Sequence, residues 1–325
     1  MRKHELKPLF VERMKNILED EKDFQNYLNV LKEEPQRSIR CNTLKISPEK
    51  LKIRLISKGW EVEQPFKSNP EIMVIKGGNG KTSLNPGELG RSLEHLLGYY
   101  YIQEISSMLP VIALNPKPNQ FILDMCAAPG SKTTQIASEM QNKGTLIANE
   151  ISLGRIKILA SNSERCGVMN LMITKKEGAS LCKKFKKSGF LFDKILIDAP
   201  CSGEGTLRSS SLTSKIWNIR TIKKLSGIQK NLLINALEIL KPKGEIVYST
   251  CTHAPEENEE VISFILNRFE KELVIEKLDL PVFYRPGIKS WRGKDYHPDV
   301  VKCCRIYPQD NNTEGFFITK IKKIK

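Results

Sequence analysis

The sequence predicts an α/β protein whose main domain is a doubly wound, mostly parallel sheet with helices on both faces. From residue 120 onward, short apolar runs alternate with segments of helical periodicity, and this alternation is typical of βαβ units. Acidic residues and cysteines also fall at or just after the ends of the apolar runs. Because such sheets bind ligands at the carboxyl ends of their strands, these residues are expected to share one site.

Residues 1–115 differ in pattern and are predicted to form a smaller α/β module with a linker, ahead of a main domain at residues 116–325. Within the module, Ser47 and Pro48 mark a helix start, since serine caps a helix and proline suits its first turn. The expected elements are a helix within 7–31, a strand within 37–47, a helix at 47–60, an alternating strand over 60–75 and a glycine-rich loop at 76–90.

The main domain is expected to alternate between strands and helices in a regular order. Strands are predicted at 120–126, 144–150, 171–175, 192–200 and 244–251, and helices at 131–140, 153–167 and 226–242.

The composition indicates an anionic partner and a reducing compartment. The chain has 52 Lys and Arg against 37 Asp and Glu, a net charge of +15, which favours nucleic acid as the partner; the alternative is solubility alone. Eight cysteines form no Cys-x-x-Cys pair and there is no signal peptide, so a cytoplasmic location is expected. No apolar run approaches the roughly 20 residues of a membrane span. No histidine has metal-ligand spacing to a cysteine, so neither a membrane nor a metal is expected.

The segment "DMCAAPGSKTT", residues 124–134, has the features of a ligand-binding loop. Its small residues let the backbone approach a ligand, and the following helix offers free N–H groups. It matches neither the GxGxxG fingerprint nor a Walker loop. Glu150 ends the next predicted strand, where an acid accepts hydrogen bonds from ribose hydroxyls. A nucleoside cofactor without phosphates, such as S-adenosylmethionine, therefore fits better than NAD; the alternative is a routine turn with a solvated carboxylate.

Two cysteines follow predicted strands of the same sheet. Cys201 lies in "IDAPCSGEGTLR", shortly after Asp198, and Cys251 lies in "VYSTCTHAPEENEE". A single cysteine after a strand is usually a small apolar side chain. Two of them at strand ends, beside an acid and a ligand loop, favour a chemical role instead. The other six cysteines are interpreted as small apolar side chains, and among them Cys126 is expected to pack within its loop.

Three segments carry a resemblance to a known family. "DMCAAPGSKTTQIA", "FDKILIDAPCSGEGTLR" and "VYSTCTHAPEENEEVI" resemble the signature motifs of the Sun/nucleolar-protein family of RNA cytosine-5 methyltransferases. "RCNTLK", "GYYYIQEISSMLP" and "RIYPQDNNTEGFFITKI" are similar to the flanking segments, so the likeness runs from about residue 37 to the end. The resemblance implies a Rossmann-like methyltransferase fold behind a small RNA-recognition module, with S-adenosyl-L-methionine as cofactor and RNA as substrate.

The resemblance also implies roles for residues. Carbon 5 of cytosine becomes nucleophilic when a thiolate adds to carbon 6, and a base must later remove the carbon 5 proton. By the family pattern Cys251 is the nucleophile, Cys201 assists release and Asp198 holds the cytosine edge. Lys132 is a candidate to lower the pKa of a thiol. The implied cofactor contacts are Cys126, Ala127, Ala128, Pro129, Gly130, Ser131, Lys132, Glu150, Arg155, Glu177 and Asp198.

Two of these contacts have alternatives. Glu177 departs from the family, which more often has aspartate there, and Arg155 could simply face solvent.

Competing functions fit the two cysteines less well. A DNA cytosine-5 enzyme would use the Pro-Cys cysteine and lack the Thr-Cys one, and a non-catalytic RNA-binding relative would have lost one of the two. Only about 70 residues follow Cys251, which leaves no room for an added RNA-binding domain. Transfer RNA is therefore favoured over ribosomal RNA as the substrate, and the protein is expected to be a monomer.

Overall fold

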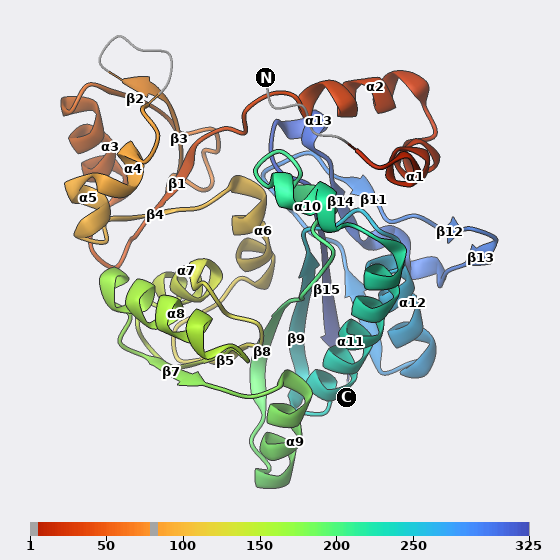
Figure 1. Ribbon diagram of the computed structural model, residues 1–325. Coiled ribbons are helices and arrows are strands. Elements are labelled where there is room, and N and C mark those ends of the chain that lie inside the picture. Colours follow the sequence, from red (N-terminus) through yellow and green to blue (C-terminus); the bar gives the residue numbers. More distant parts are fainter. Residues whose placement is uncertain (1–5, 79–83, 325) are drawn as a thin grey trace.

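The N-terminal residues form two short helices that pack on the main domain. A computed structural model describes residues 6–78 and 84–324 (Figure 1). The pattern at 7–31 is split into α1 (Pro8–Leu18) and α2 (Glu21–Val30), because Glu19 has a positive φ of 60°. Asp20 then begins α2 by accepting the Asp23 N–H at 2.7 Å, a typical N-cap.

The apolar faces of α1 and α2 meet residues far along the chain. Phe10 lies edge-on to Trp217, with ring centroids 5.5 Å apart. Arg13, which is 1% exposed, donates to both carboxylate oxygens of Glu256 at 2.7 and 3.0 Å. These helices are therefore anchored to the C-terminal part of the chain, and Figure 1 shows them in the upper right, beside α13.

The small sheet is antiparallel, with strands in the order β2-β3-β1-β4. The predicted single strand over 60–75 is wrong: it is two strands joined by a turn, since Pro65 and Pro70 interrupt the pattern and proline cannot donate to a ladder. The strands are β1 (Ser38–Cys41), β2 (Trp60–Glu63), β3 (Ile72–Gly78) and β4 (Tyr100–Ile102), with helices α3 (Pro48–Ser57), α4 (Glu88–Arg91) and α5 (Leu93–Leu96). Residues 79–83 of the predicted loop lie outside the described residues.

The main sheet confirms the predicted α/β class. Its strands follow the order β11-β14-β15-β9-β8-β5-β6-β7, with β10 beside β15. The strands β5 (Phe121–Asp124), β6 (Thr145–Asn149), β7 (Leu171–Thr174), β8 (Phe192–Asp198) and β9 (Leu240–Thr250) are parallel. β10 (Leu273–Glu276), β11 (Arg285–Pro286), β14 (Cys304–Ile306) and β15 (Phe316–Lys323) add an antiparallel side.

Helices cover both faces of this sheet (Figure 1). One apolar cluster joins the strands to α9 (Gly178–Ser188), α11 (Ile219–Leu237) and α12 (Glu259–Arg268). A second cluster joins them to α6 (Ile105–Leu114) and α7 (Ser131–Glu139), and α8 (Leu153–Cys166) lies beside α7. The smaller elements are α10 (Ser211–Ile216), α13 (Pro308–Asn311), the hairpin β12 (Ser290–Trp291) and β13 (Lys294–Asp295), and single 3-10 turns at Glu204–Thr206 and Pro298–Lys302.

A buried ion pair connects α12 to β14 beneath the loop that follows β9. Arg305 donates to the two carboxylate oxygens of Glu259 at 2.5 and 2.6 Å, and neither side chain is more than 3% exposed. Arg305 also donates to the carbonyl of His253 at 3.0 Å. The pair therefore holds the chain just after Cys251.

We predict that Arg305→Met destabilises the fold strongly, because it leaves Glu259 as an uncompensated buried charge. The free energy of unfolding, measured by urea titration, should fall by about 3–5 kcal/mol. Lys302→Met is the control, since its ion pair with Asp299 is exposed and such pairs contribute little. Equal urea midpoints for the two variants would contradict a structural role for the buried pair.

Candidate active site

The two cysteines singled out in the sequence lie in contact. The parallel pairing of β8 and β9 aligns Asp198 with Ser249, so the loops that follow leave the sheet at the same level. The Sγ atoms of Cys201 and Cys251 are 3.1 Å apart, and the Cys251 N–H donates to the Cys201 Sγ at 3.3 Å. The hydrogen bond with Cys251, followed by burial, raises the pKa of Cys201. Cys201 is therefore a neutral thiol at physiological pH.

The two cysteine loops are joined directly by their hydroxyl groups. The Oγ of Ser202 and the Oγ1 of Thr252 are 2.8 Å apart. On the other side, the Ser202 N–H donates to Glu257 at 3.1 Å, and the Gln229 amide donates to Glu257 and to the Pro200 carbonyl, both at 2.8 Å. These bonds fix the backbone on both sides of Cys201.

Sequence reasoning missed this set of supporting residues. Glu257 and Ser202 lie inside the segments that carried the resemblance, so their proximity to the cysteines was the available signal. No feature of the sequence pointed to Gln229, which lies in the middle of α11. Burial raises the pKa of Glu257 to about 7, although the hydrogen bonds that it accepts from Ser202 and Gln229 act in the opposite direction.

Asp198 is paired with Lys132. The Nζ of Lys132 lies 2.8 Å from one carboxylate oxygen of Asp198, and the Ser249 hydroxyl donates to the other at 2.8 Å. Lys132 also donates to Ser107 at 2.9 Å. Lys132 thus neutralises Asp198, and an effect of Lys132 on the pKa of a thiol stays a prediction.

The loop after β5 has the geometry expected of a ligand loop. Gly130 begins α7 with a φ of 106°, a conformation that disfavours other residues. Asp124 is buried at the end of β5, where one of its oxygens accepts the Thr133 hydroxyl at 2.7 Å and the other has no partner. Burial raises the pKa of Asp124 to about 7. Burial also raises the pKa of the Cys126 thiol. Cys126 thus packs within the loop, as expected.

Glu150 and Arg155 form a pair at the end of β6. The guanidinium of Arg155 lies 2.9 Å from one oxygen of Glu150, and the Ser152 N–H donates to the other at 2.9 Å. Arg155 also donates to the Ala128 carbonyl. Arg155 therefore connects Glu150 to the loop rather than only facing solvent.

Glu177 has a structural partner of its own. Its carboxylate begins α9 by accepting the N–H groups of Ala179 and Ser180 at 3.1 and 2.8 Å. A contact from Glu177 to a cofactor stays a prediction.

A cavity of about 880 Å³ opens in front of Cys251. Its walls come from both halves of the chain: Lys132, Asp198, Ala199, Cys251 and Phe316 at one end, and Leu31–Ser38, Pro86, Leu89 and Ile102 at the other. Cys201 is not among the lining residues. Among the described residues, no cluster of three or more His, Cys, Asp or Glu side chains is arranged to hold a metal ion.

Comparisons with known proteins agree with this geometry. The family model for the 16S rRNA methyltransferase RsmB/F matches residues 111–322, and that for the N-terminal domain of 16S rRNA methyltransferase RsmF matches residues 6–105. A tRNA (cytosine(49)-C(5))-methyltransferase of Pyrococcus abyssi is 41% identical over 94% of this chain and 93% of its own length. The ribosomal RNA small subunit methyltransferase F of Psychromonas ingrahamii is 38% identical over 99% of this chain, which spans only 64% of that relative.

Two solved structures from Pyrococcus horikoshii share the fold. A methyltransferase homologue superposes with a TM-score of 0.78 and 32% identity, covering 98% of this chain and all of its own. NSun6, solved with SFG, superposes with a TM-score of 0.82 and 25% identity, covering 99% of both chains. The fold and the ligand loop thus define an S-adenosylmethionine-dependent methyltransferase. The chain belongs to the RsmB/F, or Sun, family of RNA cytosine-C5 methyltransferases.

The loop residues fit the cofactor that the family uses. The unpartnered oxygen of buried Asp124 can accept a hydrogen bond from an amino group. Glu150 follows the last residue of β6, the position at which an acid in such folds accepts ribose hydroxyls, and this role for Glu150 stays a prediction. No helix in the described part of the chain has the length and apolar character to cross a membrane.

We predict that Glu150→Ala weakens binding of S-adenosylmethionine by roughly 1–3 kcal/mol, because a charged hydrogen-bond partner is lost. Isothermal titration calorimetry with the cofactor alone measures this directly. Glu164→Ala, an exposed position on α8, is the control and should bind as the wild type does. Unchanged affinity of Glu150→Ala would remove this residue from the cofactor site.

Proposed function

We propose that this protein methylates carbon 5 of a cytosine in transfer RNA, through a covalent bond between Cys251 and carbon 6 of the base. The contact of the two thiols, 3.1 Å apart at the head of the cavity, is the observation that carries the mechanism. The choice of transfer RNA is supported by the Pyrococcus abyssi relative, which this chain matches over 93% of its length. The ribosomal RNA relatives have more than a third of their length outside the match.

The assignment of Cys251 as the nucleophile rests on access and charge. Cys251 lines the cavity, whereas Cys201 is not among the residues that line it. Because Cys201 keeps its proton, its S–H can donate to the Cys251 sulfur and stabilise negative charge there. The thiolate of Cys251 then adds to carbon 6, and carbon 5 becomes able to attack an electrophile.

When bound, S-adenosylmethionine supplies an electrophilic methyl group. After methylation, the proton on carbon 5 must leave before the Cys251 sulfur can be expelled. A base or water takes this proton, and the electrons of the C–H bond form the carbon 5–carbon 6 double bond as the sulfur leaves. Cys201, whose sulfur lies 3.1 Å from the Cys251 sulfur, assists this release by donating a hydrogen bond from its S–H to the departing thiolate. Asp198, with its charge balanced by Lys132, is available at the cavity wall to accept the amino group of the cytosine.

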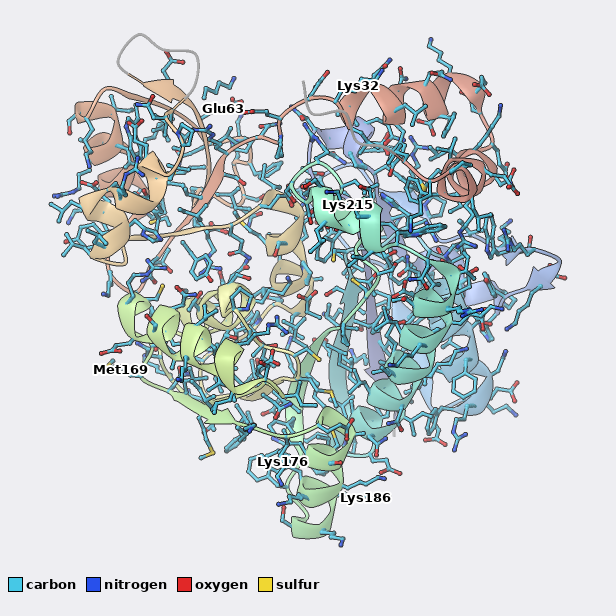
Figure 2. All side chains as sticks on the ribbon, viewed as in Figure 1. Lys32, Glu63, Met169, Lys176, Lys186 and Lys215 are labelled. Atoms are coloured by element: carbon cyan, nitrogen blue, oxygen red, sulfur yellow. The ribbon has the colours of Figure 1, made fainter. Side chains whose placement is uncertain are left out.

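The charge of the protein supports an RNA substrate. The net charge is +15, and basic side chains attract RNA phosphates over a distance. Figure 2 shows labelled lysines at opposite ends of the molecule, Lys32 beside α2 and Lys186 on α9. Lys32 lies at the rim of the cavity. We further propose that the enzyme works as a monomer in the cytoplasm, with all eight cysteines as free thiols.

The two thiols should be separable by mutation. Cys251→Ala should yield neither product nor a covalent complex with RNA, because no bond to carbon 6 forms. Cys201→Ala should methylate once and stay attached, giving a slower band on a denaturing gel that reducing agent does not dissolve, since a thioether is not a disulfide. A trapped band from Cys251→Ala instead would reverse the two roles.

The RNA class can be tested by bisulfite sequencing of total RNA from cells that lack the gene. We expect one or more cytosines of transfer RNA to lose methylation, and re-expression of the wild type but not of Cys251→Ala to restore it. Loss confined to ribosomal RNA would overturn the choice of transfer RNA and leave the chemistry intact.

A further inference from the structure

Glu314 is an acid on the cavity wall that the mechanism does not use. It comes two residues before Phe316, the first residue of β15, and that strand pairs with β9 so that Phe317 is opposite Thr250. The Gly315 N–H donates to the Gly205 carbonyl at 2.9 Å, and the Gly205 N–H donates to the Cys251 carbonyl at 2.8 Å. Two backbone hydrogen bonds thus hold the segment of Glu314 beside the nucleophile.

The carboxyl of Glu314 is buried and lacks a partner. The residue is 4% exposed, and neither of its carboxylate oxygens has a hydrogen bond of normal geometry. Burial raises the pKa of Glu314 to about 7, although Ser209 lies close enough to lower it in part. An unsatisfied buried acceptor is costly, so a ligand that donates hydrogen bonds to this carboxyl would remove that cost.

Most hydrogen-bonding groups around Glu314 have other partners, although the Nε of Arg208 has none. The carboxylate of Glu104 accepts the N–H groups of Glu314 and Ser106, at 3.1 and 2.7 Å. The guanidinium of Arg208 donates to the Thr313 carbonyl and the Asn312 side chain, at 3.0 and 2.7 Å, and forms no ion pair with Glu314. The protein therefore leaves Glu314 for whatever enters the cavity.

The cavity has room for more than the target base. Sites of roughly 300 Å³ hold a small ligand, and this cavity measures about 880 Å³. It extends from Cys251, past Glu314 and Arg208, to the segment Leu31–Ser38. A cytosine at Cys251 leaves space for a neighbouring nucleotide, and RNA-binding proteins read the Watson–Crick edges of such unstacked bases.

The ionised form of Glu314 selects among the four bases, and a ligand with two N–H donors favours that form over the neutral acid. A carboxylate is an acceptor with two oxygens, suited to two parallel N–H donors. Guanine presents N1–H and an amino group side by side. Adenine and cytosine present one amino group next to an acceptor nitrogen, and uracil presents one N–H between two carbonyl groups.

We infer that Glu314 reads a guanosine next to the target cytosine, accepting hydrogen bonds from its N1–H and 2-amino group. This inference rests on the proposed function, since it requires an RNA in the cavity. It assigns Glu314 to specificity, with no part in forming or breaking bonds.

The test uses synthetic RNAs that contain one methylatable cytosine, with guanosine or inosine on either side of it. Inosine lacks only the 2-amino group. The wild type should show a kcat/KM roughly tenfold higher for guanosine on one side, the effect of one good base contact. Glu314→Gln should reduce this ratio to less than twofold, whereas Glu314→Asp, which keeps the charge, should retain part of it.

Glu272→Gln, at an exposed turn after α12, is the matched control and should keep the wild-type ratio. Thermal unfolding of each variant reports on folding, and a purely structural defect in Glu314→Gln would slow all RNAs equally. A wild-type ratio in Glu314→Gln, or no preference for guanosine on either side, would overturn the inference.

A second readout keeps the inference apart from the proposed function. Filter binding of the same RNAs to Cys251→Ala measures the guanosine preference without any methylation. If no RNA is methylated but the preference is present and depends on Glu314, the proposed function fails and the reading of guanosine stands.

Discussion

The position of every atom in the active site depends on the register between β8 and β9. These strands are parallel neighbours with Asp198 opposite Ser249, so the loops after them begin at the same edge of the sheet. The central residues Ile195, Leu196 and Val247 are fully buried. A slip of one residue would move their side chains to the other face, and the two sulfurs could no longer meet. The apolar core therefore fixes the distance between the sulfur atoms of Cys201 and Cys251, which lie outside it.

Three buried or partly buried cations near the site each hold a different loop. Lys132 restrains Asp198, Arg13 restrains the segment at Glu256, and Arg305 restrains the chain at His253. Because buried charges are expensive unless paired, each loop has one low-energy arrangement. The thiols thus lie in a rigid frame rather than on mobile loops, and orienting them demands little of the bound substrate.

Much of this site could be predicted because its signals are local. The ends of β5, β6, β8 and β9 follow from apolar runs that stop at an acid or a polar residue, and parallel topology then brings those ends together. The family resemblance assigned roles within the same short segments. Boundaries that depend on a single backbone angle, such as the break at Glu19, have no such signal. Alternation over 60–75 predicts one strand, although Pro65 and Pro70 divide it into two.

Contacts between distant segments could not be predicted in this way. Gln229 reaches Pro200 from the middle of an ordinary amphipathic helix, and Glu314 reaches the cavity only because β15 returns antiparallel beside β9. Periodicity describes which face of an element is apolar, but it does not say which element that face will meet. Side chains that contact a residue on a distant element can therefore be identified only from the folded structure.

The docking of α1 and α2 has a consequence for the way this protein is made. Their apolar side chains, Phe10, Met14 and Tyr27 among them, share a cluster with Trp217 and Tyr307, which leave the ribosome long afterwards. During synthesis the first helices have no surface to fold on, although chains usually fold from the N-terminus. The segment after α2 lines the cavity, so that wall is set only when the last strands arrive. This wall of the cavity is therefore completed only after the chain has been synthesised as far as Tyr307.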